Sequence, residues 1–261
     1  MELSLRKTTI QNLDYTLSSC PSTQDEYLIV AYKFVKELFC GVCQQSLLFC
    51  NSKFGIVEYP FLFRERQLDS VVLPVISSLC KGLVIAEYPV IRDSNLKGYE
   101  KDGSSGRIDY WCIYKDYSFV IEMKHSYDGF KTDITSDARL IKRWKTMTVS
   151  QLQDIRDEVK LFEEKTKGLI RLGLHFITPY TDCDRNMDDF DLFERNQKEI
   201  LTRLSNDVSR SKPKTTTPDF MASWVLPRNQ RFLEVPLKGT YPGLLLLGKI
   251  FPAIKHDGCI K

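Results

Sequence analysis

Two carboxylates and a lysine interrupt one apolar, aromatic-rich stretch of the chain. The stretch is GRIDYWCIYKDYSFVIEMKH, residues 106–125, with Asp109 near its start and Glu122 and Lys124 near its end. A strand that only needs burial does not carry these charges, so we ask what chemistry they perform. Side chains alternate faces along a strand, which sets Glu122 and Lys124 on one face.

The same stretch predicts a β-hairpin around a two-residue turn at positions 115–116. Such a turn pairs Tyr114 with Tyr117, and the continuing register brings Asp109 opposite Glu122. Directly opposed residues of an antiparallel pair point to the same face. The hairpin is therefore expected to gather the two acids and the lysine in one cluster, which a slip of one residue would abolish.

Two carboxylates this close repel each other, unless a cation lies between them. Mg²⁺ prefers one or two carboxylates together with waters and phosphate oxygens. A neighbouring ammonium stabilises developing negative charge or orients an attacking water. The alternative is a set of exposed charges on the solvated face of a sheet. Apolar neighbours make that alternative less favourable, namely Ile108, Ile113, Val120 and Ile121.

At these positions the chain resembles the PD-(D/E)XK nuclease superfamily, in the motifs Gly106-Arg107-Ile108-Asp109 and Glu122-Met123-Lys124. Ile108 stands where the family often has proline. By element order the resemblance extends over residues 56–180. It implies that Asp109, Glu122 and the backbone carbonyl of Met123 ligate Mg²⁺ or Mn²⁺. It also implies that Lys124 serves the nucleophilic water.

The family often adds an acid from the helix that precedes the first core strand, and Glu65 is our candidate for it. Glu65 heads the apolar stripe of its predicted helix, formed by Leu68, Val72, Ile76 and Leu79. The alternative is a solvated carboxylate that the helix dipole favours in the first turn. Glu87, on the following predicted strand, is the second candidate.

A polar residue from the helix after the hairpin often lies near the site in this family. Gln151 and Gln153 both fall in the first turns of that predicted helix, residues 149–167. We select Gln153, with an ordinary exposed glutamine as the alternative.

The segment RLIKRWK, residues 139–145, carries basic side chains and no acid. Beside a site that cuts phosphodiesters, these cations are candidates for contacts to the nucleic-acid backbone. They are Arg139, Lys142, Arg143 and Lys145. Trp144 either stacks on an unpaired base or is buried in the core, and burial is the favoured interpretation.

The order of predicted elements indicates an α/β protein with a restriction-endonuclease-like α/β/α core around a mixed sheet. We expect a helical extension over residues 1–55, a nuclease-like core over 56–180, and a C-terminal helix and strands over 181–261 packed on the same domain. Helices are predicted at 22–50, broken near Gly41, and at 60–80, 149–167 and 189–208. Strands are predicted at 83–90, 169–180, 219–227 and 241–251, and residues 129–147 are expected to be irregular.

Composition limits the remaining classes. The net charge of +3 permits a nucleic-acid partner without requiring one. We find no secretory signal and no apolar run of membrane-spanning length, so we expect a cytoplasmic protein without membrane contact. The eight cysteines are then expected to be reduced.

These observations favour a metal-dependent endonuclease that acts on DNA in restriction, phage defence, mobile-element biology or repair, with RNA left open as a substrate. Two alternatives keep the fold without the chemistry: an inactive nucleic-acid-binding or assembly subunit, and a purely protein-binding component. A homodimer or a partner subunit is compatible with all three.

Overall fold

The computed structural model describes residues 3–51, 56–92, 104–153, 155, 166–181, 186–210, 217–231 and 238–254. Its helices are α1 (Glu26–Leu47), α2 (Glu65–Leu79), α3 (Ala138–Lys145) and α4 (Met187–Ser209), with short 3-10 turns η2 (Pro60–Leu62) and η6 (Arg228–Gln230) and a π-helical turn η3 (Thr146–Gln151). Its strands are β1 (Leu5–Ile10), β2 (Leu13–Ser18), β3 (Cys50–Asn51), β4 (Ile56–Val57), β5 (Val84–Arg92), β6 (Ser104–Tyr114), β7 (Tyr117–Gly129), β8 (Leu169–Tyr180), β9 (Phe220–Val225) and β10 (Gly243–Ile254).

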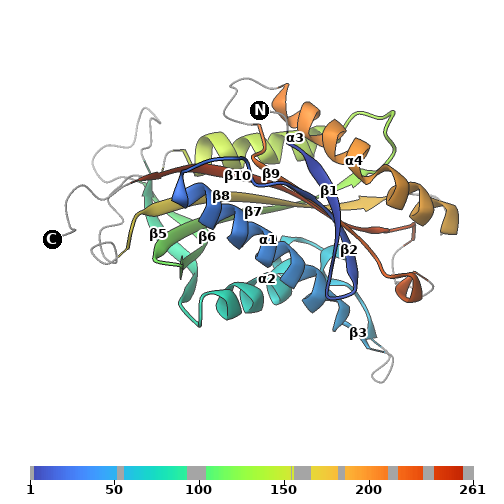
Figure 1. Cartoon of the computed structure of the whole chain (residues 1–261), viewed down its shortest axis with the longest axis horizontal. Coiled ribbons are helices and arrows are strands. Elements are labelled where there is room, and N and C mark those ends of the chain that lie inside the picture. The colour runs from blue at the N-terminus through green and yellow to red at the C-terminus, as the bar shows by residue number, and fades with distance from the viewer. Residues whose placement is uncertain are drawn as a thin grey trace.

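One eight-stranded sheet runs through the molecule in the order β1-β2-β9-β10-β8-β7-β6-β5 (Figure 1). Its strands pair antiparallel except β7 and β8, which are parallel and are connected through α3 and η3. The sheet is therefore mixed, and the predicted α/β class is confirmed. Its assignment to the restriction-endonuclease-like fold stays a prediction.

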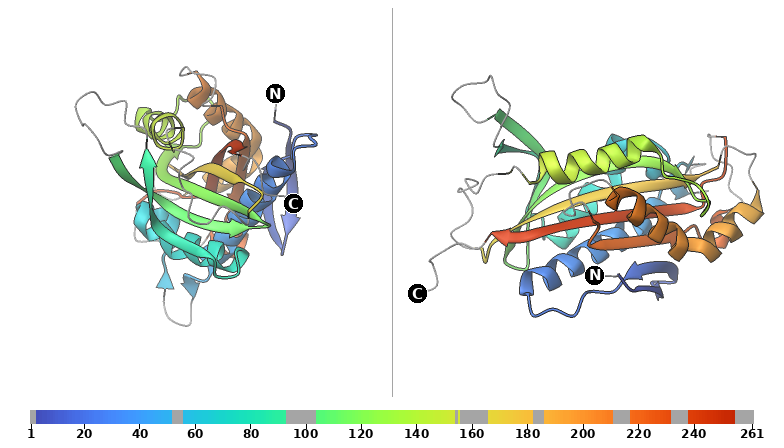
Figure 2. Two further views of the ribbon diagram at one scale, coloured as in Figure 1. Left: turned by 90° about the vertical axis from the view of Figure 1, so that its left-hand side faces the viewer. Right: turned by 90° about the horizontal axis from the view of Figure 1, so that it is seen from above.

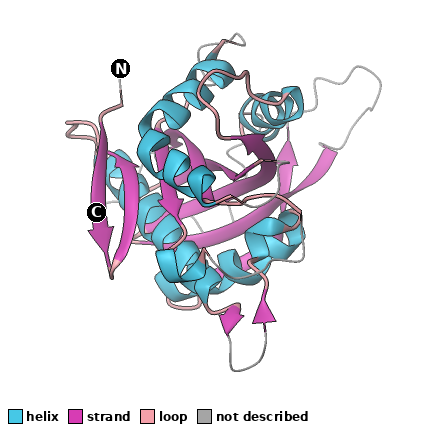
Figure 3. Cartoon of the chain, turned by 90° about the vertical axis from the view of Figure 1, so that its right-hand side faces the viewer, coloured by secondary structure: helices cyan, strands magenta, loops and turns pink. Residues whose placement is uncertain are grey.

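Helices cover both faces of this sheet (Figures 1 and 3). Alternation along β7 sends Phe119, Ile121 and Met123 into the core beneath α1 and α2, and Val120 into the core beneath α3 and α4. Each face thus has its own apolar core, as a three-layer α/β/α arrangement requires. Among the described helices, none is long and apolar enough to cross a membrane.

The N-terminal segment differs from the predicted helical extension. Residues 5–18 form the hairpin β1–β2, and β2 pairs with β9, so the hairpin extends the sheet at the edge opposite β5 (Figure 2). The partner strand lies about two hundred positions later in the chain, which local patterns do not reveal. Only α1 agrees with the predicted extension.

The predicted break of α1 at Gly41 is also wrong. Helix α1 continues through Gly41. This glycine lies where α1 packs against α2, so its role is close packing of the two helices and not the end of a helix. A Cβ at Gly41 would lie 2.5 Å from Cγ1 of Val75, so the missing side chain lets α1 and α2 approach.

Residues 129–147, expected to be irregular, contain α3. Asp137 caps this helix by accepting the Arg139 backbone N–H at 2.6 Å, and Leu140 and Trp144 bury its apolar side. These two apolar side chains, one turn apart, hold an otherwise basic helix against the core. Of the helix predicted at 149–167, residues 154 and 156–165 lie outside the described ranges.

Candidate active site

The site forms where β6 leaves β7. Pairing runs from Tyr114–Tyr117 to Tyr110–Ile121, which confirms the predicted register. Asp109 and Glu122 come next in the register, but the backbone pairing of β6 with β7 ends before them. The side chain of Asp109 bonds the β7 backbone instead. Its Oδ2 accepts the Met123 backbone N–H at 2.5 Å.

The turn at positions 115–116 explains the register. Lys115 and Asp116 have φ values of 47° and 64°, the left-handed conformation that two-residue hairpin turns favour. This turn places Tyr114 opposite Tyr117. It thereby sets every following pair of the hairpin, and so brings Asp109 to the position of Glu122.

Lys124 is the centre of the cluster. Its Nζ donates to Glu122 Oε1 at 2.8 Å and to the Met123 carbonyl at 2.9 Å, and lies 3.8 Å from Glu65 Oε1. The Glu122 side chain is only 3% exposed and that of Lys124 16% exposed. The lysine therefore bridges three oxygens at the border between the core and solvent.

Glu65 comes from the helical layer on the opposite face of the sheet from α3. It is the first residue of α2, and its Oε2 accepts the His125 backbone N–H at 3.1 Å while Oε1 faces Lys124. The structure thus brings Glu65 into the cluster. Glu87 instead lies exposed on the edge strand β5, 3.8 Å from Arg107.

Gln151, and not Gln153, joins the cluster. Gln151 Nε2 donates to Glu122 Oε1 at 2.5 Å. Gln153 is exposed, and its backbone carbonyl accepts from Arg171 at 3.3 Å. Gln151 ends the π-helical turn η3, whose wider spacing shifts the phase of a regular helix. The sequence narrowed the choice to two glutamines, and the turn decides between them.

Charges in the cluster perturb one another. Burial and the Glu122 carboxylate raise the pKa of Asp109 to about 7, against the opposing effects of the Met123 N–H and Lys124. Burial by itself lowers the pKa of Lys124, but Glu122, Glu65 and Asp109 outweigh it, so the net pKa is raised. The site therefore holds an excess of negative charge that favours a cation.

Two buried histidines lie next to Lys124, His125 on the same strand β7 and His175 on the neighbouring strand β8. His175 is the β8 partner of Lys124, and its Nε2 lies 2.9 Å from Ser126 Oγ. His125 Nε2 lies 2.9 Å from Thr178 Oγ1. Burial lowers the pKa of His125 to about 4 and that of His175 to about 3, so both rings are neutral at neutral pH.

The basic helix α3 also reaches this site. Arg143 Nη1 donates to the backbone carbonyl of His125, the residue after Lys124. Trp144 is fully buried, with its ring stacked on His175 at 6.3 Å, so the favoured burial of this tryptophan is confirmed. Arg139, Lys142 and Lys145 are exposed.

The oxygens of the cluster fit a divalent cation in kind. Among the described residues, no three His, Cys, Asp or Glu side chains stand close enough together to form a ready metal cage. The Lys124 ammonium, however, contacts Glu122 Oε1 and the Met123 carbonyl, two of the three ligands that the motif implies. A bound cation would take the place of that ammonium, with Asp109 as the third ligand.

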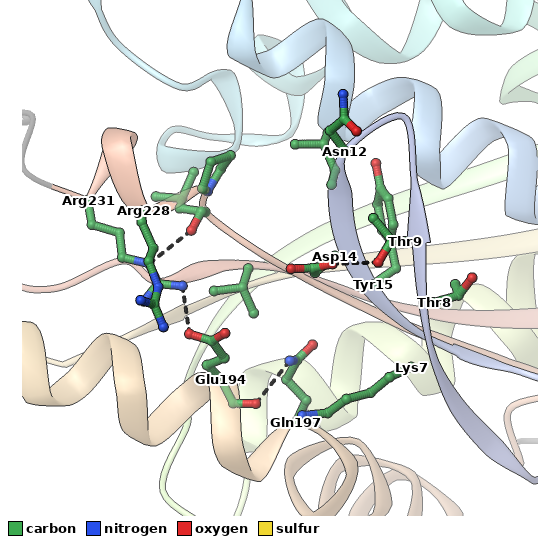
Figure 4. A pocket seen from close by; sticks show the side chains of 14 residues that line it. Lys7, Thr8, Thr9, Asn12, Asp14, Tyr15, Glu194, Gln197, Arg228 and Arg231 are labelled. Atoms are coloured by element: carbon green, nitrogen blue, oxygen red, sulfur yellow. Dashed lines mark hydrogen bonds and ion pairs between the residues drawn. The ribbon is translucent and has the colours of Figure 1, made fainter.

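A hollow of about 560 Å³ lies elsewhere, between the β1–β2 hairpin, α4 and η6 (Figure 4). Its buried Arg231 donates to the Leu226 carbonyl at 3.0 Å, to Asp191 at 3.4 Å and to Glu194 at 2.8 Å. Gln197 in the same wall bonds Ser223 and the Glu194 carbonyl. The polar groups of Arg231 and Gln197 thus hydrogen-bond protein groups of the wall itself.

No protein-family model, curated protein or solved structure matches this chain.

Proposed function

We propose that this protein is a metal-dependent nuclease that hydrolyses phosphodiester bonds, with DNA as the expected substrate. One observation carries the proposal: Lys124 lies on Glu122 and on the Met123 carbonyl, beside an Asp109 carboxylate with a raised pKa. Such hydrolysis needs two acids, a carbonyl and a lysine. These groups lie together here, at the point where β6 and β7 separate.

In this proposal Asp109, Glu122 and the Met123 carbonyl would hold Mg²⁺ or Mn²⁺. When bound, the ion would act as a Lewis acid that neutralises negative charge on the scissile phosphate. It would also lower the pKa of a water molecule bound to it. Glu65 accepts from the His125 backbone N–H through one oxygen and presents the other toward Lys124, where it orients the ammonium.

Lys124 acts as a hydrogen-bond donor rather than as a base. The surrounding carboxylates raise its pKa, so the amine stays protonated at neutral pH. A protonated lysine orients the attacking water and stabilises the charge that develops on the phosphate oxygens. Gln151 holds Glu122 Oε1 from the other helical layer, which fixes the carboxylate in position.

Plasmid DNA incubated with Mg²⁺, with Mn²⁺ or with a chelator tests the proposal. The wild type is expected to nick or cut only with metal, and Lys124→Ala to lose at least about a hundredfold in rate. A Lys7→Ala control removes the same charge at an exposed position of the edge strand β1, far along the sheet from β7, and should cut normally. DNA binding without metal-dependent cutting by the wild type would instead support an inactive binding subunit.

A further inference from the structure

Helix α3 carries more positive charge than its fold requires. Arg139, Lys142, Arg143 and Lys145 are exposed within eight residues that contain no acid. None of the four forms an ion pair with any residue in the described ranges, which leaves them available to an external anion.

Helix stability accounts for only part of this charge. Lys142, Arg143 and Lys145 lie in the last turn, where cations complement the helix dipole. Arg139 lies in the first turn, where the dipole disfavours a cation. Its backbone N–H bonds the Asp137 cap, but its guanidinium has no such stabilising role.

The cations divide between two flanks of α3. Residues four apart are neighbours on a helix, so Arg139 and Arg143 form a row. Arg143 Nη1 donates to the His125 carbonyl, so this row faces β7, whose Glu122 and Lys124 form the acidic cluster together with Asp109 and Glu65. Lys145 lies about 200° around the helix from Arg143, on the other flank.

The row runs alongside β7 away from the cluster. Asp137 N–H donates to Asp128 at 2.9 Å, Arg143 reaches His125, and Gln151 reaches Glu122 at 2.5 Å. The chain from 137 to 151 thus passes β7 in the reverse direction. Arg139 lies between the levels of Asp128 and His125, beyond Arg143 as seen from Glu122.

A buried polar network holds the start of α3 in place. Arg203 of α4 donates to Asp128 at 2.8 Å and to Ser136 Oγ at 2.9 Å. Ser136 in turn donates to Asp207 at 2.8 Å from its hydroxyl and at 2.9 Å from its backbone. Leu140 and Trp144 bury the underside of the helix. The arginine row is therefore presented by a rigid support, which lowers the entropic cost of binding.

We propose that Arg139 and Arg143 bind successive phosphates of one nucleic-acid strand, which leaves the acidic cluster along α3. The substrate is then a polymer that extends past the cut on this side, rather than a mononucleotide. This inference rests on the proposed function for the position of the cut, but the binding row is testable without any cutting.

Fluorescence anisotropy with a labelled 20-nucleotide probe, in chelator and in a Glu122→Gln background, measures binding alone. Arg139→Gln and Arg143→Gln are each expected to raise Kd roughly tenfold and to lower the slope of log Kd against log salt by about one on duplex DNA. Lys145→Gln is the matched control and should change Kd less than about twofold. Single-stranded DNA, duplex DNA and RNA probes identify the preferred polymer, and inorganic phosphate should not compete at the probe's Kd.

Arg139→Gln is the decisive variant, because its side chain forms no hydrogen bond or ion pair with the residues that the structure describes, so its loss should not disturb the fold. If the Arg139→Gln and Lys145→Gln variants weaken binding equally, or if neither arginine matters, the inference is overturned. If the wild type cuts DNA and both arginine variants bind as it does, the proposed role of the two arginines is wrong and the nuclease proposal stands. If binding depends on the two arginines but the wild type does not cut with metal, the binding role of the arginines stands and the nuclease proposal is wrong.

Discussion

The ammonium of Lys124 lies 2.8 Å from Oε1 of Glu122, two residues earlier on the same face of β7. The same ammonium contacts the Met123 carbonyl at 2.9 Å. In the proposed reaction Glu122 and Met123 bind the metal, and the lysine serves the water. A cation held by these oxygens would require Lys124 to move off them, so the lysine and the ion would compete for the same oxygens.

This competition predicts that Lys124→Gln binds Mn²⁺ about tenfold more tightly than the wild type, because a nearby positive charge has been removed. The same variant should not cut DNA. Glu122→Gln should lose Mn²⁺ binding, because a ligand is gone. Isothermal titration of each variant with Mn²⁺ measures the affinities, with Lys145→Gln as a control of equal charge change. Weaker Mn²⁺ binding by Lys124→Gln would contradict the competition.

Gln151 and Gln153 form a matched pair for the positioning of Glu122. Removing the 2.5 Å hydrogen bond in Gln151→Ala frees the carboxylate. We expect the rate of cutting to fall roughly tenfold, with the KM for DNA little changed. Gln153→Ala, at an exposed position, should retain wild-type kinetics. Equal rates in the two variants would show that Gln151 does not position Glu122.

Asp109 is expected to lower the stability of the metal-free protein. Its pKa rises from 3.8 to about 7 on folding, so the folded state binds a proton more readily than the unfolded state between these pH values. Stability due to this group therefore decreases as pH rises toward 7, and the penalty is fully present above it. Asp109→Asn should raise Tm at pH 8 by about 5 °C and less at pH 5.

Differential scanning fluorimetry in chelator measures this change, and Asp133→Asn, at an exposed aspartate, serves as the control. An Asp109→Asn variant that melts at or below the wild-type temperature at pH 8 would rule out a cost of burying this carboxylate beside Glu122.

The neutral histidines predict loss of stability in acid. Their pKa values fall from 6.5 to about 4 for His125 and to about 3 for His175 on folding. Below pH 6.5 the unfolded chain takes up protons that the folded core excludes, so stability is full above this pH and decreases below it. The expected loss at pH 5 is about 2 kcal/mol for each ring.

Urea unfolding between pH 7 and 5 tests this in the Asp109→Asn background, where the opposing effect of that carboxylate is absent. His175→Gln should decrease the pH dependence of the unfolding free energy by about half. An unchanged pH dependence would mean that His175 is already protonated, or is exposed, in the folded protein.

Local sequence patterns were sufficient for the hairpin and for the placement of its charged side chains. A two-residue turn sets the register of residues 110–121, and the period of two sets Glu122 and Lys124 on one face. Glu65 was predictable because the same 3.6-residue period that buries Leu68 and Val72 also turns the first residue of α2 inward. The register and the faces are short-range relations that neighbouring residues define, whereas the meeting of Glu65 with Lys124 also needs α2 to pack against β7.

Long-range packing decided the rest. β2 pairs with a strand about two hundred positions away, and no local pattern announces that partner. The π-helical turn η3 brings Gln151, and not Gln153, to Glu122. A π-helical turn holds more residues than an α-helical turn, so the side chains along it point in directions that differ from those of a regular helix. Burial of Leu140 and Trp144 against the core sets how α3 is rotated, and this rotation turns Arg143 toward β7, where it donates to the His125 carbonyl.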